Sequence, residues 1–304
     1  MYYNENTIIY LNGGFIKASE AKIDLYSQSL HYGYAVFEGI RSYKTESGET
    51  KIFKAVEHYD RLKQSAEAMN MPYKWTTAEL IAANYEVLKQ NNLQDAYIRP
   101  VIYAPANMGF AKNTESFITI QAWEMQPFLG DKLLKVMTSS FQRPNPKGFK
   151  ITAKASGHYV NSILASQEAK AKGFDEALLL DMHDFVAEGP GANVFYEKDG
   201  RLFTPSLGNI LPGITRATVL EICNMLDIPV EEKQISPAEL KQADAAFFCG
   251  TAAEVIGWES LDETKFPIDW KETLSNKIQT AYKNIIVEKS TAENKKTTIE
   301  KQFA

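Results

Sequence analysis

The start of the chain has an alternating apolar pattern that predicts a β-hairpin. Ile8 and Tyr10 share one parity, Phe15 begins a second apolar run, and Asn12-Gly13 lies between them. Asn and Gly tolerate the positive φ angles of a type I′ turn, so this dipeptide is a strong hairpin signal. We therefore expect two short antiparallel strands near the N-terminus.

Apolar residues recur at helical spacing in five later segments. Thr76 and Glu79 precede the second of these segments and predict a capping box. Gly173 follows the third and is expected to end that helix as its C′ residue. The five predicted helices cover residues 57–69, 80–90, 159–172, 211–226 and 271–288.

Extended patterns between these helices predict strands. In the first strand, alternation places Tyr97, Arg99, Val101 and Tyr103 on one face. Pro100 has no N–H to donate to a neighbouring strand, so this strand is expected at a sheet edge or at a bulge. The predicted strands are 96–103, 116–123, 133–140, 176–181 and 245–251, and Asp199-Gly200 predicts a second hairpin.

The length of 304 residues allows one large or two medium domains. Composition changes near residues 126–131, where a helix- and strand-rich half gives way to Pro, Gly and Asp. We expect a small N-terminal α/β domain at 1–128, a linker at 129–134 and a larger domain at 135–289. The polar residues 290–304 are expected to form a frayed tail.

Charge and composition argue against several classes of protein. The chain has 33 Lys and Arg against 38 Asp and Glu, a net charge of −5, whereas nucleic-acid-binding proteins usually carry a basic domain or stripe. An apolar content of 44% is typical of a globular chain. No apolar run approaches the roughly 18 residues of a membrane span, and the N-terminus does not resemble a signal peptide.

Cysteine and histidine usage predicts neither a disulfide framework nor a metal centre. Cys223 and Cys249 are the only cysteines, which favours a reducing compartment and a cytoplasmic protein. The four histidines are scattered, and no zinc-binding His-Glu-x-x-His occurs. The chain also has no phosphate-binding P-loop, no dinucleotide-binding glycine fingerprint and no nucleophile elbow.

Four segments do combine residue types that catalysis uses. Lys154 lies among Ala, Ser and Gly, which leave room around an amine, and Glu188 precedes Gly-Pro-Gly. A helix start with a Thr hydroxyl offers backbone amides to an anion. Each segment alone has a plainer alternative: a surface lysine, a solvated glutamate or an ordinary N-cap. The segments are 151–159, 187–195, 211–216 and 249–254.

These segments belong to a longer series. In chain order the sequence contains HYGYAVFEGIRSY, EHYDRL, AYIRP, KASGHYVNSILASQEA, EGPGANVF, LPGITR and GTAAE. Together they closely resemble the class IV pyridoxal-phosphate aminotransferases of fold type IV, and within that class they are most similar to the branched-chain amino acid aminotransferases. The resemblance covers roughly residues 8–285.

The resemblance implies a fold, a cofactor and a reaction. The fold is a mixed α/β architecture of two domains, with pyridoxal 5′-phosphate at their interface. The reaction is the reversible transfer of the amino group from L-leucine, L-isoleucine or L-valine to 2-oxoglutarate. The resemblance also implies a homodimer or a higher homo-oligomer, in which the segment 107–110 reaches the site of the neighbouring subunit.

The resemblance also implies roles for individual residues. Lys154 matches the lysine of the internal aldimine, Glu188 the carboxylate facing the pyridine nitrogen, and Tyr159 the tyrosine at the phenolic oxygen. These types suit the chemistry, because an aldehyde requires an amine and a dianionic phosphate requires a guanidinium and oriented amides. The implied phosphate grip is Arg61, Ile214, Thr215 and Thr251.

A second group of residues matches the substrate pocket of the family. Tyr32, Phe37 and Trp123 match its walls, although ordinary core positions are the alternative for these aromatic residues. The remaining matches are Tyr97 and Arg99, which form a polar recognition strand, together with Thr251 and Ala252.

The sequence departs from the family pattern at two positions, and other branches of the family stay open. Ala192 stands where the family often has Glu, and Cys249 where it often has Ser. The alternatives are a D-amino acid aminotransferase, an aminodeoxychorismate lyase and an (R)-amine transaminase. The D-amino acid branch resembles a carboxylate trap with a His two residues after the strand arginine, whereas Pro100 and Val101 follow Arg99 here. The Tyr-Ile-Arg-Pro strand at 97–100 and the Phe-Glu-Gly-Ile-Arg segment at 37–41 argue against the other two. A non-catalytic α/β binding protein is the alternative from another class.

Overall fold

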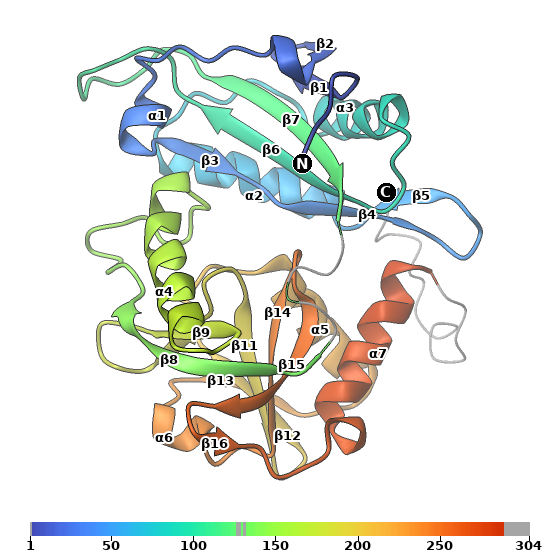
Figure 1. Cartoon of the computed structure of the whole chain (residues 1–304), viewed down its shortest axis with the longest axis vertical. Coiled ribbons are helices and arrows are strands. Elements are labelled where there is room, and N and C mark those ends of the chain that lie inside the picture. Colours follow the sequence, from blue (N-terminus) through green and yellow to red (C-terminus); the bar gives the residue numbers. More distant parts are fainter. Residues whose placement is uncertain (1, 126–128, 130–131, 289–304) are drawn as a thin grey trace. The chain divides into compact units, whose positions relative to one another are not determined.

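The computed structural model describes residues 2–125, 129 and 132–288, and these pack as two compact units (Figure 1). The first unit contains residues 2–125 and also 153–157, whereas the second contains the rest. The sequence predicts two continuous domains joined at 129–134. In the structure, residues 153–157 instead pack with the first unit. Residues 130–131 of the expected linker and the expected tail at 290–304 lie outside the described residues.

The first unit is built on a seven-stranded antiparallel sheet. Its order is β2-β1-β7-β6-β4-β5, and β3 also pairs with β6. The expected hairpin joins β1 to β2, and the turn residues Asn12 and Gly13 have φ angles of 50° and 100°. The strands are β1 Ile8–Leu11, β2 Gly14–Lys17, β3 Ala35–Phe37, β4 Ile40–Lys44, β5 Thr50–Ile52, β6 Ala96–Tyr103 and β7 Phe117–Glu124.

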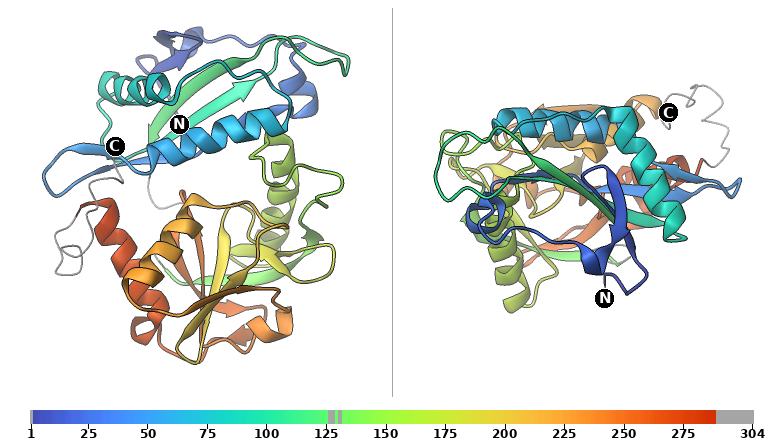
Figure 2. Two further views of the ribbon diagram at one scale, coloured as in Figure 1. Left: turned by 180° about the vertical axis from the view of Figure 1, so that it is seen from behind. Right: turned by 90° about the horizontal axis from the view of Figure 1, so that it is seen from above.

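Two helices cover one face of this sheet, and the core lies between them and the strands (Figure 2). They are α2 Ala55–Ala68 and α3 Thr77–Gln90, and a short α1 Gln28–Tyr32 precedes β3. The predicted capping box is confirmed, because Thr76 accepts from the Glu79 N–H and Glu79 accepts from the Thr76 N–H. Buried residues of the core include Ile40, Leu62, Leu80, Ile98 and Ile120.

β6 is a central strand, so the expected edge position is wrong. It pairs with β7 along its length, and its other side pairs with β4 at 96–98 and with β3 at 101–103. The Pro100 carbonyl accepts a hydrogen bond from the Glu38 N–H at 3.0 Å. The nitrogen of Pro100 faces the same side, where Glu38 and Gly39 interrupt the partner strands. At this position neither partner strand offers a carbonyl to pair with residue 100, so the missing N–H of Pro100 loses no hydrogen bond of the sheet.

The second unit contains a nine-stranded sheet that closes on itself. β10 pairs with both β9 and β11, so six strands form a ring in the order β10-β9-β8-β15-β14-β11. All six strands contribute to one buried apolar cluster, which is the inside of the ring. The strands are β8 Leu134–Gln142, β9 Glu176–Leu180, β10 Val186–Glu188, β11 Asn193–Lys198, β12 Arg201–Pro205, β13 Val230–Lys233, β14 Ala245–Gly250, β15 Glu254–Leu261 and β16 Thr264–Lys265.

The longer helices pack on the outside of this ring, and Leu240 of a short helix joins the apolar cluster inside it. The longer ones are α4 Tyr159–Ala171, α5 Ile214–Met225 and α7 Leu274–Ile286, and α6 spans Pro237–Leu240. Ala165 and Ala169 of α4 pack on Met137, Ala177 and Leu179 of the strands. These helices and strands confirm the predicted mixed α/β class. In residues 2–288, apart from the short undescribed gaps, no helix has the length and apolar character to cross a membrane.

Candidate active site

The segment that carries Lys154 packs as an extra strand beside β3. The Phe37 N–H donates to the Lys154 carbonyl at 3.0 Å, Val36 bridges to Ala155, and the Gly157 N–H donates to the Gly33 carbonyl at 3.0 Å. The small side chains that the sequence places around this lysine therefore have a structural purpose. They let residues 153–157 lie close against β3, which fixes the backbone from which the Lys154 side chain extends.

Lys154 lies next to β3 and α2. The backbone N–H of this residue donates to the Ser65 hydroxyl at 3.0 Å, and its Nζ lies 5.2 Å from the centroid of the Phe37 ring. The residue as a whole is half-buried. The hydrogen bonds to Ser65 and Phe37 fix the backbone of Lys154, and the Phe37 ring lies beside its amine.

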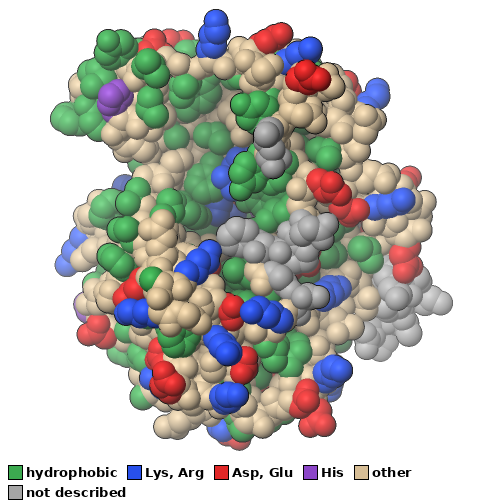
Figure 3. Space-filling view, viewed as in Figure 1, with side chains coloured by type: hydrophobic (Ala, Val, Ile, Leu, Met, Phe, Trp, Pro, Cys, Tyr) green, Lys and Arg blue, Asp and Glu red, His purple; other side chains and the backbone are tan. Residues whose placement is uncertain are grey.

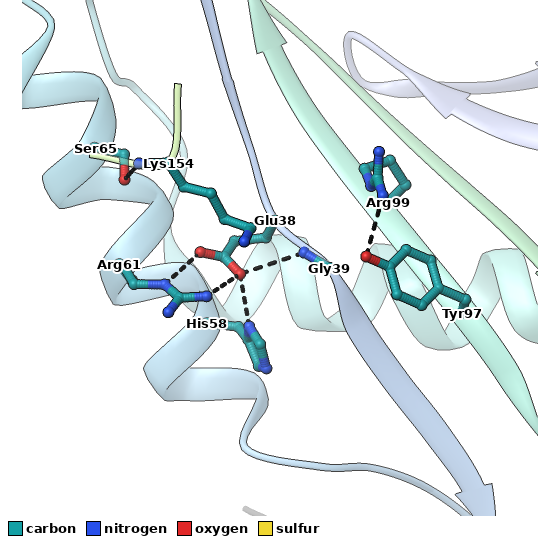
Figure 4. Close-up of polar contacts among 8 residues, drawn as sticks. All are labelled: Glu38, Gly39, His58, Arg61, Ser65, Tyr97, Arg99 and Lys154. Atoms are coloured by element: carbon teal, nitrogen blue, oxygen red, sulfur yellow. Dashed lines mark hydrogen bonds and ion pairs between the residues drawn. The ribbon is translucent and has the colours of Figure 1, made fainter. Parts of the chain in front are cut away.

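Glu38 follows Phe37 and forms a buried clamp on α2 (Figure 4). Its carboxylate accepts hydrogen bonds from Arg61 Nε at 2.7 Å, from Arg61 Nη2 at 2.8 Å and from His58 Nδ1 at 2.7 Å. Glu38 is completely buried, and Arg61 and His58 are nearly so. A bidentate Arg–carboxylate pair fixes the plane of the guanidinium. The clamp therefore ties the break between β3 and β4 to α2.

Within this clamp, Glu38 and Arg61 form an ion pair, and His58 is neutral. Burial raises the pKa of Glu38, but the charge of Arg61 and the hydrogen bonds from His58 and Arg61 outweigh it and hold the pKa well below its ordinary value of 4.5. Burial lowers the pKa of His58 below its ordinary value of 6.5, although Glu38 opposes the shift, and the charges of Arg61 and Lys154 lower it further. At neutral pH a neutral His58 thus donates its Nδ1–H to an ionised Glu38.

Aromatic rings surround the guanidinium of Arg99 on the opposite face of β6. The Arg99 Cζ lies 4.7 Å from the Phe37 ring centroid, 5.2 Å from that of Tyr97 and 5.9 Å from that of Trp123. Arg99 Nη2 donates to the Tyr97 hydroxyl at 3.1 Å, while the Arg99 Nε is buried without a partner in the described residues. The group thus combines apolar walls with a cationic donor.

Tyr32 belongs to a different surface of the first unit. It lies in α1, its hydroxyl donates to the Met108 carbonyl at 3.2 Å, and its ring centroid lies 5.6 Å from that of Phe110. Apolar side chains gather here over α1 and the loop after β6 (Figure 3). They include Leu25, which is 71% exposed, Leu30 at 56% and Phe110 at 91%. We call Leu25, Leu30, Tyr32, Met108 and Phe110 the α1 apolar patch.

In the second unit, Glu188 lies where the ring of strands closes. It pairs in register with Asn193, whose Nδ2 donates to its carboxylate at 2.9 Å. Arg143 Nη2 contacts the same carboxylate at 2.9 Å, and the Leu211 N–H donates to it at 3.1 Å. Both Glu188 and Arg143 are buried. The Arg143 cation and the two amide donors hold this buried carboxylate in one orientation.

The start of α5 presents backbone amides close to this carboxylate. Gly213 is the N-cap of this helix, which begins with Ile214 and Thr215, and no side chain in the described part of the chain caps it. A Cβ at Gly213 would lie 1.9 Å from the Asn193 side-chain oxygen, so the approach of α5 to β11 requires glycine there. The amides of an uncapped helix start attract anions. This corner of the second unit therefore fits a phosphate.

The remaining predicted residues lie in the second unit as well. Thr251 and Ala252 form the turn between β14 and β15, and Tyr159 is the first residue of α4. All three are half-buried. Cys249 pairs with Asn193 in register, and burial raises the pKa of its thiol well above its ordinary value. This cysteine is therefore an uncharged packing residue.

Sequence reasoning missed four residues that organise these clusters: Glu38, His58, Ser65 and Arg143. Glu38 had a visible signal, because an acidic residue directly follows the apolar run Ala35–Phe37 that forms a buried strand. Arg143 opens the Pro- and Gly-rich loop that precedes the Lys154 segment. His58 and Ser65 had no such signal, because their partners come from distant parts of the chain.

Comparisons with known proteins agree on one family. The family model described as Amino-transferase class IV matches residues 35–261. A branched-chain-amino-acid aminotransferase of Pseudomonas aeruginosa is 38% identical over 291 residues, which are 94% of either chain.

Solved structures are similar over nearly the whole chain. The branched-chain aminotransferase of Thermoproteus uzoniensis with norvaline has a TM-score of 0.90 and 35% identity, and the match covers 95% of this chain and 97% of that one. The branched-chain amino acid aminotransferase of Thermobaculum terrenum, in its PLP-bound holo form, has a TM-score of 0.88 and 32% identity over 94% and 96% of the two chains.

Proposed function

Because this chain belongs to the class IV aminotransferases, we propose that it is a branched-chain amino acid aminotransferase. It would transfer the amino group reversibly between L-leucine, L-isoleucine or L-valine and 2-oxoglutarate, with pyridoxal 5′-phosphate as cofactor. The observation that carries the proposal is the support of Lys154 by β3 and α2, on the same unit as the Arg99 group. That unit thus supplies an amine and a recognition group for substrate.

The donor set of the chain fits this cofactor. Its phosphate suits the uncapped start of α5 at Ile214 and Thr215, with Thr251 and Arg61 as the further donors that we propose. The carboxylate of Glu188 is buried and orientated by Arg143 and Asn193, as a partner of a protonated ring nitrogen must be. Tyr159 is the proposed hydrogen-bond donor to the phenolic oxygen of the cofactor.

Bound pyridoxal 5′-phosphate would supply an aldehyde that accepts amino groups and a ring that withdraws electrons. Glu188 would hold a proton on the ring nitrogen, because its fixed negative charge favours the protonated form. Lys154 would attach the cofactor through Nζ and then use the released amine to move the α-proton of the substrate. Ser65 and Phe37 hold the backbone of Lys154, from which this amine extends.

The substrate pocket must accept two different side chains in turn. Phe37, Trp123 and Tyr97 offer apolar faces to leucine, isoleucine and valine. Glutamate brings a second carboxylate, which is costly to bury without a partner. We propose that Arg99, whose Nε is buried without a partner in the described residues, binds that carboxylate.

The proposed reaction is tested by initial rates with a panel of amino acids against 2-oxoglutarate. L-leucine, L-isoleucine and L-valine are expected to react fast, whereas L-aspartate and D-alanine react slowly. The apolar rings near Arg99 favour the branched side chains. The side chain of aspartate is shorter than that of glutamate, so its second carboxylate does not reach the same position. Faster turnover of D-alanine than of L-leucine would assign the chain to the D-amino acid branch, and release of pyruvate from aminodeoxychorismate to the lyase branch.

We further propose a homodimer or a higher homo-oligomer, with the α1 apolar patch at its interface. Exposed apolar area of this kind marks a protein contact more often than a solvent face. Because the patch joins Tyr32 to the segment 107–110, we propose that the two act together at the site of the neighbouring subunit. The two cysteines are buried and unpaired, which suits the cytoplasm as the proposed location.

Sedimentation velocity tests this assembly. The wild-type protein is expected to sediment as a dimer or larger at micromolar concentration. Phe110→Asp places a charge on the most exposed member of the patch and is expected to shift the protein toward monomer with lower specific activity. Phe15→Asp, a change on the β2 strand of the hairpin, is the matched control. A fully active wild-type monomer would refute the proposal.

A further inference from the structure

The sequence contains a Phe-Glu-Gly-Ile-Arg segment at 37–41, in which Gly39 has no role in the proposed reaction. β3 ends at Phe37 and β4 begins at Ile40, so Glu38 and Gly39 form the break that faces Pro100. Figure 4 shows the Glu38 carboxylate on one side of this break and the Tyr97 hydroxyl on the other. Consecutive residues of an extended chain point to opposite faces, which accounts for this division.

The hydroxyl of Tyr97 occupies the space that a side chain at residue 39 would fill. A Cβ at Gly39 would lie 1.9 Å from the Tyr97 hydroxyl oxygen and 2.7 Å from its Cζ. Both distances are far below van der Waals contact, so Tyr97 and any larger residue 39 exclude each other. Gly39 itself is buried, and Tyr97 is only 6% exposed.

The clamp of Glu38 decides which of the two groups would move. The backbone beside Gly39 is tied to α2 by three short hydrogen bonds from Arg61 and His58 to a completely buried carboxylate. The Tyr97 hydroxyl, by contrast, has one hydrogen bond among the described residues, from Arg99 at 3.1 Å. Displacing a buried ion pair costs much more than breaking one side-chain hydrogen bond. A larger residue 39 would therefore displace the Tyr97 ring rather than the backbone.

We infer that Gly39 is a positioning residue for substrate recognition, a conclusion that rests on the proposed function. Its missing side chain lets the Tyr97 hydroxyl lie where it accepts from Arg99 Nη2. This hydrogen bond and the neighbouring rings orient the guanidinium, whose buried Nε then remains available for a substrate carboxylate. Glu38 supports the arrangement from the other face by keeping residue 39 against Tyr97.

The test uses the cofactor-loaded enzyme and the variant Gly39→Ala. Binding of glutarate, a dicarboxylate without an amino group, is followed by tryptophan fluorescence, because Trp123 lies 5.1 Å from the Tyr97 ring. The dissociation constant of glutarate and the KM for L-glutamate are expected to rise about tenfold, which is the effect of losing one charge-assisted hydrogen bond. Gly14→Ala is the control, since its Cβ would meet only the Leu11 carbonyl oxygen, at 3.8 Å.

A second variant separates positioning from a general effect on folding. In a Tyr97→Leu background the ring end is gone, so adding Gly39→Ala is expected to change the glutarate dissociation constant less than about twofold. If Gly39→Ala alone fails to fold, the double variant is expected to fold, because the clash has been removed. Equal effects in both backgrounds, or misfolding of the double variant, would overturn the inference. An inactive wild type would instead overturn the proposed function, whatever the variants do.

Discussion

Lys154→Ala is expected to abolish transamination, with a loss of about 10⁴-fold or more in kcat. A positioned base contributes about 10²–10⁴-fold, and this amine would also attach the cofactor, so the upper end of the range applies. Borohydride reduction of the wild type followed by peptide mapping is expected to find the cofactor on the peptide with Lys154. The same treatment of the variant should leave no labelled lysine.

Lys150→Ala is the matched control for this experiment. Lys150 precedes the same segment but is exposed, so its removal should leave both the rate and the labelling unchanged. Added methylamine is expected to restore part of the lost activity of Lys154→Ala, because a small amine can occupy the vacated space near Phe37. A label on another lysine, or a variant that retains a tenth of the rate, would contradict the assignment.

Glu38→Gln is expected to lower the free energy of unfolding at pH 7 by about 3–5 kcal/mol. The reason is that the variant leaves the Arg61 guanidinium buried without its carboxylate, and removing one partner of a buried ion pair costs about this much. Urea unfolding followed by circular dichroism measures the difference. Glu67→Gln lies on the same helix α2 and removes the same charge from an exposed position, so it should change the unfolding free energy little.

The contribution of Glu38 also has a definite dependence on pH. Its folded-state pKa lies well below the ordinary value of 4.5, so the unfolded chain takes up a proton at a higher pH than the folded chain. The stabilisation is complete above about pH 4.5 and is lost as the pH falls toward the folded-state pKa. The difference between wild type and Glu38→Gln should therefore shrink below this pH. A constant difference down to pH 3 would mean that Glu38 acts through packing and not through its charge.

Local sequence rules determined the elements that each short segment forms. Asn12-Gly13 fixed a hairpin because both residues take positive φ angles, and Thr76 with Glu79 started α3 because each satisfies the other's backbone N–H. Gly173, with a φ of 82°, follows the end of α4 as expected. Alternation also assigned Tyr97 and Arg99 to one face of β6, where they form a hydrogen bond.

Tertiary structure decided which of these segments meet, because a partner can lie anywhere along the chain. The sequence predicts an edge position for Pro100, but in the sheet its nitrogen faces the break at Glu38 and Gly39 between two partner strands. Residues 153–157 belong to the first unit because β3 supplies hydrogen-bond partners that no nearby sequence indicates.

For the charged residues of the site, too, the sequence predicts which residues matter, and the tertiary structure decides their partners. The motif series predicts Lys154, Glu188 and Arg61 as site residues, since they stand within recognisable segments. The clamp of Glu38, His58 and Arg61 depends on distances of 2.7–2.8 Å between atoms of β-sheet and helix. The ion pair of Arg143 with Glu188 likewise joins residues that are far apart in the sequence. Side-chain type sets what a residue can do, and burial beside a particular partner sets its charge and orientation, which only the folded chain supplies.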